Sequence, residues 1–497
     1  MTDIETRTIP VRNPRTGATD FTFPAGSPES VVPDSAMSTP GEQRFSRGYR
    51  AWMLFVLFLV SALNLADRTG IAAIAPAIKA ELALSDTELG LLQGLAFAIF
   101  YTVMGLPLAR LAEHRSRSLL LSISVAVFGV AAACCGFSMT FAMLVLCRIA
   151  VAIGDGGFSP IVGSLIGDHY PMNKRASAMS VIWFGAPVGA ASGSIVGGWL
   201  AQNGSWRHWF FVLSVPALVI AVLCMLTLRE PSRGMSDSGQ AKGPPPTMKT
   251  ALAFLLRKRS MRHVLIGAGL AAMTTQALGQ FWGRFLVSVY HTSFAEAGRL
   301  IGVIVTVSML SGFTLGGFGL DWVGRRDRRW YVWGPAIGLL ISTPLMLWGV
   351  TRPGIAAGMP FVLVAHVALF VYYTPTLAIA QNMVAANMRA SSAFVAAIVL
   401  GLVGTGLGPS LTGVLSDFFA QQAFGSGDFK AACVGVAGRH ALSAPAAQLC
   451  QSASATGIRY AIMAMSLLCP WGAIHYFMAA RHFRADLETR YLETAVA

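Results

Sequence analysis

Long apolar runs alternate with short polar connections over most of this chain. Each run is close to the roughly 17–25 residues that a helix needs to cross a bilayer. The runs predict twelve spanning helices, at residues 51–78, 88–112, 119–137, 141–168, 176–202, 209–228, 264–290, 297–322, 330–350, 361–386, 391–419 and 458–480. The residues are 54% hydrophobic and 12% charged, whereas soluble domains carry about 25% charged residues. The pattern predicts an all-α membrane protein and argues against a soluble core.

Two polar segments divide the chain. Residues 1–46 are rich in Thr, Pro, Ser and Gly, which predicts a disordered cytoplasmic tail, and they lack the apolar segment of a cleaved signal peptide. Residues 229–260 are polar and basic, which predicts a cytoplasmic linker with a short surface helix around 248–256. The remaining segments are then a six-helix bundle at 47–228, a second six-helix bundle at 261–484 with an outward loop at 420–456, and a cytoplasmic tail at 485–497.

The distribution of positive charge predicts the orientation in the membrane. The formal net charge is +14, and most of the 37 Lys and Arg residues lie in alternate connections, above all residues 229–262 and 325–329. Basic connections stay in the cytoplasm. We therefore expect a multi-pass protein of the cell inner membrane with both termini in the cytoplasm. A nucleic-acid partner is not expected, because a binding face for DNA or RNA gathers its basic residues on one soluble surface.

Four charged residues of the first half lie deep inside predicted spanning helices, away from the helix ends. Asp67 and Arg68 are adjacent in the first helix, and Arg148 and Asp155 lie two turns apart on one face of the fourth. A charge at the centre of a spanning helix costs at least about 2.5–3.5 kcal/mol. A carboxylate near a guanidinium can alternate between an ionised, paired state and a protonated, neutral state. We predict that these four residues couple transport to protons. A static network that fixes helix packing is the alternative.

Other polar side chains inside the helices are candidates for contact with a substrate. Arg284 could bind an anionic group, or it could extend to the membrane surface. The others could equally be packing contacts. The predicted substrate-binding residues are Arg68, Gln93, Tyr101, Arg148, Arg284, Tyr372 and Gln381.

A loop motif occurs at matching places in the two halves. Residues 317–326 read Gly-Phe-Gly-Leu-Asp-Trp-Val-Gly-Arg-Arg, and residues 109–117 read Ala-Arg-Leu-Ala-Glu-His-Arg-Ser-Arg. Each copy places an arginine four residues after an acid, and we predict that Glu113 with Arg117 and Asp321 with Arg325 form a cytoplasmic gate. The motif resembles that of the major facilitator superfamily. This resemblance implies twelve transmembrane helices in two pseudo-symmetric six-helix bundles, with a binding site between them at the midplane.

Several stretches resemble the bacterial members of the Spinster branch of that superfamily, which transports sphingolipids and lysolipids. They are residues 64–68, 148–171, 324–331 and 389–417. The branch usually has Glu and Ala where this chain has Asp155 and Gly156. The start of the first helix also resembles the anion:cation symporter branch, which implies organic or sugar acids as the alternative substrates.

The cysteines and the absence of catalytic motifs complete the prediction. Cys433 and Cys450 lie in the outward loop and could form a disulfide in an oxidising compartment. The sequence has no GxSxG, no Walker loop and no HExxH motif, so neither an enzyme nor an ATP-driven pump is expected, and no metal site is expected.

We therefore predict a secondary active transporter that moves an amphipathic or anionic, lipid-like small molecule by alternating access. Protons are the coupling ion and no other cofactor is expected. The bilayer surrounds a monomer. A membrane sensor that transports nothing is a remote alternative, because the tail and the linker are short for a signalling domain.

Overall fold

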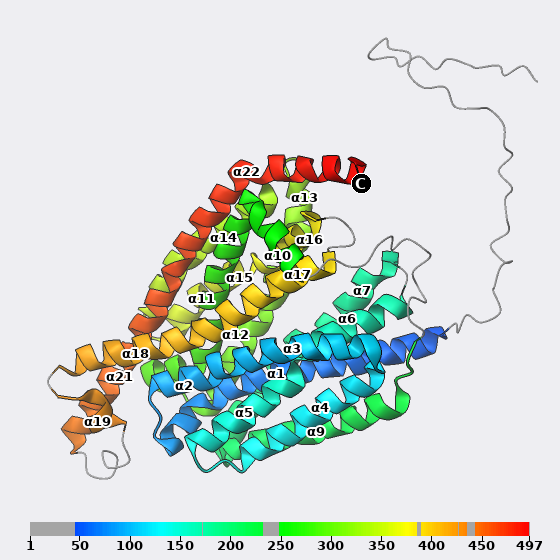
Figure 1. Cartoon of the computed structure of the whole chain (residues 1–497). Coiled ribbons are helices and arrows are strands. Elements are labelled where there is room, and N and C mark those ends of the chain that lie inside the picture. The colour runs from blue at the N-terminus through cyan, green and yellow to red at the C-terminus, as the bar shows by residue number, and fades with distance from the viewer. Residues whose placement is uncertain are drawn as a thin grey trace, which may run out of the picture. The chain divides into compact units, whose positions relative to one another are not determined.

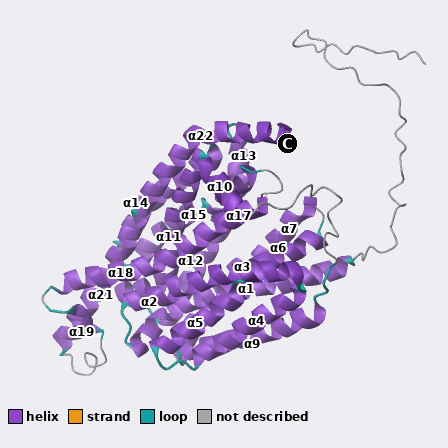
Figure 2. Cartoon of the chain, viewed as in Figure 1, coloured by secondary structure: helices purple, strands orange, loops and turns teal. Residues whose placement is uncertain are grey.

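The described part of the chain is entirely helical in its regular structure. The computed structural model describes residues 45–170, 172–231, 248–384, 389–425, 427–434 and 443–496, and no strand occurs among them (Figure 2). The predicted tail at residues 1–46 lies almost wholly outside these ranges. Twelve helical segments of the described part are long and apolar enough to cross a membrane. The predicted all-α fold with twelve spanning helices is therefore confirmed.

The N-terminal bundle contains the first six spans (Figure 1). Its helices are α1 (Arg47–Leu82), α2 (Asp86–Gln93), α3 (Leu95–His114), α4 (Arg117–Gly136), α5 (Phe141–Asp155), α6 (Phe158–His169), α7 (Met172–Trp183), α8 (Gly185–Asn203) and α9 (Trp206–Thr227). Helix α1 crosses the whole bundle. We call the end at which α1 begins the Arg47 end and the end at which it stops the Leu82 end, and we use these names for both bundles.

The C-terminal bundle follows a short helix, α10 (Met248–Arg257), in the predicted linker. Its elements are α11 (Arg259–Tyr290), α12 (Phe294–Thr314), η1 (Leu315–Gly319), α13 (Leu320–Gly324), α14 (Trp330–Val350), α15 (Ile355–Phe370), α16 (Tyr373–Asn382), α17 (Arg389–Ile398), η3 (Val399–Leu407), α18 (Gly408–Phe424), α19 (Phe429–Cys433), α21 (Ala444–Ser466) and α22 (Leu468–Val496). The segments η1 and η3 are π-helical and rich in glycine, and π-helical insertions are frequent at functional sites.

Glycine residues interrupt spans that the sequence predicted as single helices. Gly94 separates α2 from α3, and a Cβ there would lie 2.8 Å from the carbonyl oxygen of Gly406 in the other bundle. Gly156 and Gly157 separate α5 from α6 in the same way. Each of the predicted spans at 88–112 and 141–168 is still one membrane-crossing segment, and it is interrupted where a neighbouring backbone approaches closely.

Small residues let α8 pack directly against α1. A Cβ on Gly185, Gly189 or Gly193 would overlap backbone atoms of α1, at Phe58, Ala62 and Ala66. Such close contact between backbones is typical of membrane helices that carry small residues at four-residue spacing. The glycines of this helix therefore form a packing face.

We expect Gly189→Ala to destabilise the protein strongly. The added methyl group would force α1 and α8 apart, and such overpacking costs about 1–3 kcal/mol or more. The measurement is thermal unfolding of the purified protein in detergent. Gly163→Ala on α6 is the control, because a Cβ there meets nothing within 4 Å. An equal melting temperature for the two variants would contradict the α1–α8 packing.

The outward loop predicted at 420–456 is largely wrong, because most of its described part is helical. α18 continues to Phe424, α19 covers residues 429–433, and α21 begins at Ala444 rather than near residue 458. The start of α21 is built from Ala, Ser and Gln, which form helices without being apolar, so hydropathy could not detect it. Likewise, α22 runs through the tail predicted at 485–497.

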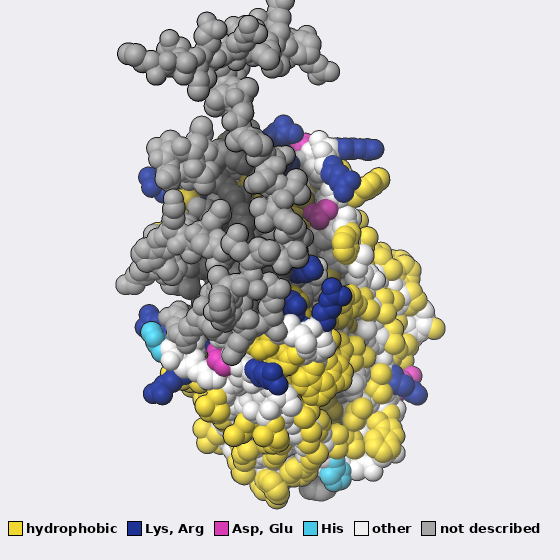
Figure 3. Space-filling view, turned by 90° about the vertical axis from the view of Figure 1, so that its right-hand side faces the viewer, with side chains coloured by type: hydrophobic (Ala, Val, Ile, Leu, Met, Phe, Trp, Pro, Cys, Tyr) yellow, Lys and Arg dark blue, Asp and Glu magenta, His cyan; other side chains and the backbone are white. Residues whose placement is uncertain are grey.

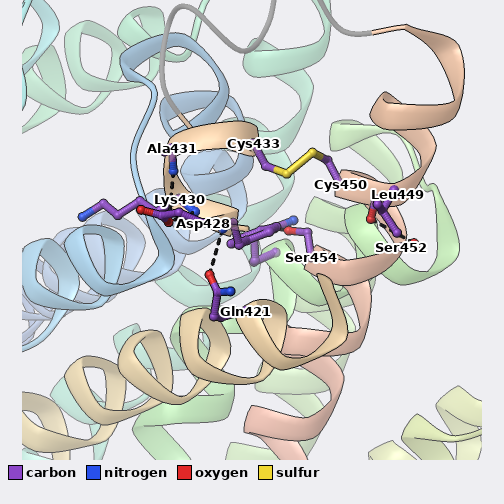
Figure 4. Close-up of a disulfide and its surroundings, with 11 residues drawn as sticks. Gln421, Asp428, Lys430, Ala431, Cys433, Leu449, Cys450, Ser452 and Ser454 are labelled. Atoms are coloured by element: carbon purple, nitrogen blue, oxygen red, sulfur yellow. Dashed lines mark hydrogen bonds between the residues drawn. A yellow bond between two sulfur atoms is a disulfide. The ribbon is translucent and has the colours of Figure 1, made fainter. Parts of the chain in front are cut away.

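A disulfide closes this region at the Leu82 end. Cys433 at the end of α19 is bonded to Cys450 on α21, with the two Cα atoms 5.5 Å apart (Figure 4). Gln421 of α18 accepts from the backbone amide of Phe429, and Asp428 caps the start of α19. The pairing that the sequence left open is present in the structure.

Candidate functional site

Two ion pairs join α1 to α5 inside the N-terminal bundle. Nη1 of Arg148 donates to both carboxylate oxygens of Asp67, at 2.8 and 2.7 Å. Nη2 of Arg68 donates to Oδ2 of Asp155 at 2.8 Å. The structure therefore brings together the four residues predicted to couple protons, and each carboxylate pairs with the arginine of the opposite helix.

The two pairs differ in their access to a ligand. Asp67 and Arg148 are 1% and 2% exposed, whereas the Arg68 side chain is 21% exposed. Removing two charges from water is costly, and only good geometry with further hydrogen bonds offsets that cost. The Asp67–Arg148 pair is thus a closed unit, and Arg68 is the charge that a ligand can reach.

Phe97 on α3 lies between the two arginines and is not among the predicted site residues. Its ring centroid lies 4.8 Å from the Arg68 guanidinium and 5.0 Å from that of Arg148. Tyr101, one turn later, stacks on Phe97 and also contacts Arg68 at 4.9 Å. Only the position of Phe97 four residues before the predicted Tyr101 could have pointed to it. The aromatic faces of α3 hold both guanidinium groups in place.

We expect Phe97→Leu to lower the transport rate about fivefold, because each cation–π contact contributes roughly 0.5–2 kcal/mol. Phe97→Tyr keeps the aromatic face and should retain the rate. Phe210→Leu removes an equally buried ring that contacts neither arginine, and it controls for the general cost of a cavity. Initial rates in proteoliposomes are the measurement. Equal losses in Phe97→Leu and Phe210→Leu would contradict a positioning role.

A small cavity lies behind Asp155. Its volume is about 10 Å³, and its lining includes the polar side chains of Asn64, Ser124 and Asp155 among apolar neighbours. This is close to the roughly 10–15 Å³ that a single water molecule needs. Asp155 therefore borders a water-sized, mostly apolar space between α1, α4, α5 and α6.

The other predicted substrate contacts are spread over both bundles. Gln93 is buried at the break before α3, and neither polar atom of its amide has a hydrogen-bond partner in the described part of the chain. Tyr372 is buried beside Tyr373, with their ring centroids 6.1 Å apart, and Gln381 is exposed on α16. A buried amide without a partner is costly, so Gln93 is the strongest of these for binding a polar group.

Arg284 belongs to a polar cluster at the Leu82 end. Its Nε donates to Oδ1 of Asp86 at 3.0 Å, and its Nη2 donates to Ser454 of α21. Asp86 also binds Lys79 and accepts from Ser416 at 2.6 Å. Asp86 is 1% exposed, so its charge is compensated entirely by these partners. The cluster joins α1 and α2 of one bundle to α11, α18 and α21 of the other.

Asp417 extends this cluster to the start of α2. Its carboxylate accepts from the backbone amides of Asp86 and Thr87 at 3.0 and 2.8 Å, and from the Thr87 hydroxyl at 2.6 Å. A carboxylate at a helix N-terminus is favourable because it meets free amide groups there. The cap comes from the opposite bundle, so it lasts only while the bundles meet at the Leu82 end.

The predicted cytoplasmic gate is partly outside the described residues. The side chain of Glu113 lies outside them, and Arg117 instead binds Asp168 of α6 and, at 2.7 Å, Glu230. Burial alone would raise the pKa of Glu230, but the Ser118 amide and the Arg117 guanidinium hold it below its usual value. These contacts link α4 to α6 and to the segment after α9.

In the second motif, Asp321 accepts a hydrogen bond from the Tyr331 hydroxyl at 2.6 Å. Arg325 is exposed and, among the described side chains, does not pair with Asp321. The ion pair expected between these two residues of the predicted gate is therefore not formed in this conformation.

Similarity to known proteins identifies the family. The sequence matches the family model described as Major Facilitator Superfamily over residues 57–425. The chain belongs to this superfamily. The major facilitator fold is also that of a bacterial homologue of the human lysosomal transporter Spinster, solved in an inward-facing, unoccupied conformation. That structure matches with a TM-score of 0.78 and 30% identity, covering 89% of this chain and 99% of the other.

Several curated transporters are also similar to this chain in sequence. An MFS-type efflux pump of Mycolicibacterium smegmatis is 27% identical, covering 92% of this chain and 98% of the pump. The sphingosine-1-phosphate transporter SPNS2 of Mus musculus is 25% identical, with coverages of 74% and 70%. The hexuronate transporter of Bacillus subtilis is also 25% identical, with coverages of 75% and 89%. The resemblance to Spinster is confirmed, and the chain is a major facilitator transporter of the Spinster type.

Proposed function

We propose that this protein moves an amphipathic, lipid-like molecule with an anionic head group across the inner membrane, and that protons drive the movement. The observation that carries the proposal is the pair of buried ion pairs between α1 and α5, of which only Arg68 is accessible. In a Spinster-type transporter this arrangement supplies a group that takes up a proton and a guanidinium that binds an anion.

The proton step begins at Asp67. When its carboxylate takes up a proton, it no longer neutralises Arg148, which keeps its positive charge. Arg148 then attracts Asp155, which lies on the same helix face, and the hold of Asp155 on Arg68 weakens. Arg68 becomes free to bind an anionic head group. Loss of the proton reverses these steps, so binding and protonation are linked.

The contacts between the bundles support transport by alternating access. The cluster of Asp86, Arg284 and Asp417 holds the bundles together at the Leu82 end, which the positive-inside prediction places on the side of the inner membrane away from the cytoplasm. Rocking of the bundles about the midplane would break this cluster and open that end. In this orientation both termini lie in the cytoplasm.

The substrate class is inferred from the asymmetry between the bundles. The two ion pairs lie in the N-terminal bundle. In the C-terminal bundle the candidates Tyr372 and Gln381 are neutral, and the charged candidate Arg284 is bound to Asp86 at the Leu82 end. A charged surface facing an apolar and aromatic one suits a molecule with an anionic head and an apolar tail. Sphingosine-1-phosphate, the substrate in the name of a relative, has this chemistry.

Uptake of organic or sugar acids is the second candidate, favoured by the similarity to the hexuronate transporter. Arg68 would bind the carboxylate of such a substrate, and the apolar surface of the C-terminal bundle would have no evident role.

The test is transport by the purified protein in proteoliposomes with an imposed pH gradient. Labelled sphingosine-1-phosphate, a lysophospholipid and glucuronate are compared, with protein-free liposomes as the control. We expect one of the lipids to be transported, and we expect a protonophore to abolish this transport. Transport of glucuronate alone would replace the lipid proposal with the second candidate, and lipid transport that ignores the gradient would remove the proton coupling.

A further inference from the structure

An apolar stripe runs along the outside of the eighth span. Its side chains are exposed and follow one another at three- to five-residue intervals along α12, η1 and α13: Val303, Val307, Leu310, Leu315, Phe318 and Trp322. A continuous exposed apolar stripe on a spanning helix faces lipid acyl chains. This face of the C-terminal bundle therefore lies against the bilayer.

The stripe ends in a basic hollow at the Arg47 end. The hollow has a volume of about 180 Å³ and is lined by Trp322, Val323, Arg325 and Arg326. The Arg326 guanidinium lies 5.8 Å from the centroid of the Trp322 ring. Tryptophan is enriched where the acyl chains meet the head groups. The hollow thus lies at the depth of lipid head groups.

In the described part of the chain, the acids beside the two arginines of the hollow are bound to other groups. Asp321 is bonded to Tyr331, and Asp327 pairs with Arg484 at 3.0 Å. Within the described ranges, no carboxylate lies at ion-pair distance from Arg325 or Arg326. The hollow therefore carries two positive charges beside an apolar surface.

We propose that this hollow binds the head-group phosphate of an anionic phospholipid. The Arg325 and Arg326 guanidiniums bind the phosphate oxygens, Trp322 lies beside the glycerol region, and the acyl chains lie along the stripe. Arginine is suited to this role because its planar guanidinium can bind phosphate through two parallel hydrogen bonds. The leaflet is the one at the Arg47 end, where Lys and Arg side chains lie beside hydrophobic flanks (Figure 3). Anionic lipids of that leaflet attract such basic groups.

The test uses the full-length, delipidated protein in detergent and native mass spectrometry. Phosphatidylglycerol and phosphatidylcholine are titrated separately, and the bound lipid is counted. We expect the double variant Arg325→Gln/Arg326→Gln to bind phosphatidylglycerol at least about tenfold more weakly, since it loses the charge-assisted hydrogen bonds to the phosphate. Arg328→Gln/Arg329→Gln removes the same charge from the same loop but leaves the hollow intact, and it should change the affinity less than twofold.

Three results would overturn the proposal. Equal losses in the two double variants would mean that only the net charge of the loop matters. Equal affinity for phosphatidylcholine in the native protein would exclude recognition of an anionic head group. Displacement of phosphatidylglycerol by millimolar inorganic phosphate would make the hollow a site for free anions. A melting temperature close to that of the native protein confirms that each variant is folded.

Discussion

Asp67→Asn is expected to abolish pH-driven transport while the protein remains folded and inserted in the membrane. Asparagine has nearly the shape of aspartate but cannot take up or release the proton. Its amide oxygen still accepts a hydrogen bond from Arg148, whose Nη1 lies 2.8 Å from Oδ1 of Asp67. The variant therefore mimics one protonation state permanently, and a coupled cycle needs both states.

The structural cost of this variant is the charge left on Arg148. Removing one partner of a buried ion pair costs about 3–5 kcal/mol when the other charge is left alone. Here Asp155 lies on the same helix face and can partly replace the lost carboxylate, so the protein should still fold. Asp67→Asn/Arg148→Gln removes both charges of the pair and should be the more stable of the two variants.

The measurement separates coupling from binding. Uptake driven by a pH gradient is compared with counterflow of labelled substrate at equal pH on both sides. We expect Asp67→Asn to lose the uptake driven by the pH gradient and to keep part of the counterflow. Asp327→Asn, which changes a carboxylate in the connection before α14, serves as the control. If Asp67→Asn leaves the pH dependence of uptake unchanged, Asp67 is not the coupling group.

Hydropathy identified the spanning helices but not their interruptions. Gly94 and Gly156 lie inside apolar runs and look like ordinary positions of a helix. What breaks the helix there is the approach of another backbone, such as the Tyr101 carbonyl oxygen, which would lie 2.7 Å from a Cβ on Gly156. That approach involves residues about fifty positions apart, so no local pattern records it.

The same close approach occurs at a position where this chain departs from the usual Spinster pattern. A glycine at position 156 brings α3 close to the junction of α5 and α6. The shorter carboxylate of Asp155 still reaches Arg68 at 2.8 Å.

The candidate site was predictable wherever a charge lay deep in an apolar run. Asp67 and Arg148 were identified by the cost of burying them, but not as partners, because a shared helix face does not reveal which acid meets which arginine. Asp86 and Asp417 were missed because they lie at the ends of apolar runs. A charged residue there has access to water and does not stand out from the polar connection beside it. Their importance comes from contacts between bundles more than 300 positions apart in sequence.

Asp86→Asn is expected to shift the protein toward a conformation that is open at the Leu82 end. Asp86 is the buried carboxylate that binds both Lys79 and Arg284. Without it, the two cations repel each other inside the closed cluster and regain water only when the bundles separate. A loss of about 1.4 kcal/mol from the closed state changes the ratio of the two conformations tenfold, and we expect a change of at least that size.

The measurement is the distance between spin labels on engineered cysteines at positions 91 and 418, which lie exposed on α2 and α18. We expect a second, longer distance to become populated in Asp86→Asn. Asp417→Asn, which removes the cap on α2, should act in the same direction. Glu81→Gln is the matched control, because Glu81 is an acid at the same end that pairs with Arg207 within one bundle. If Asp86→Asn and Glu81→Gln gave the same distance distribution, the cluster would hold helices together without controlling the opening of the Leu82 end.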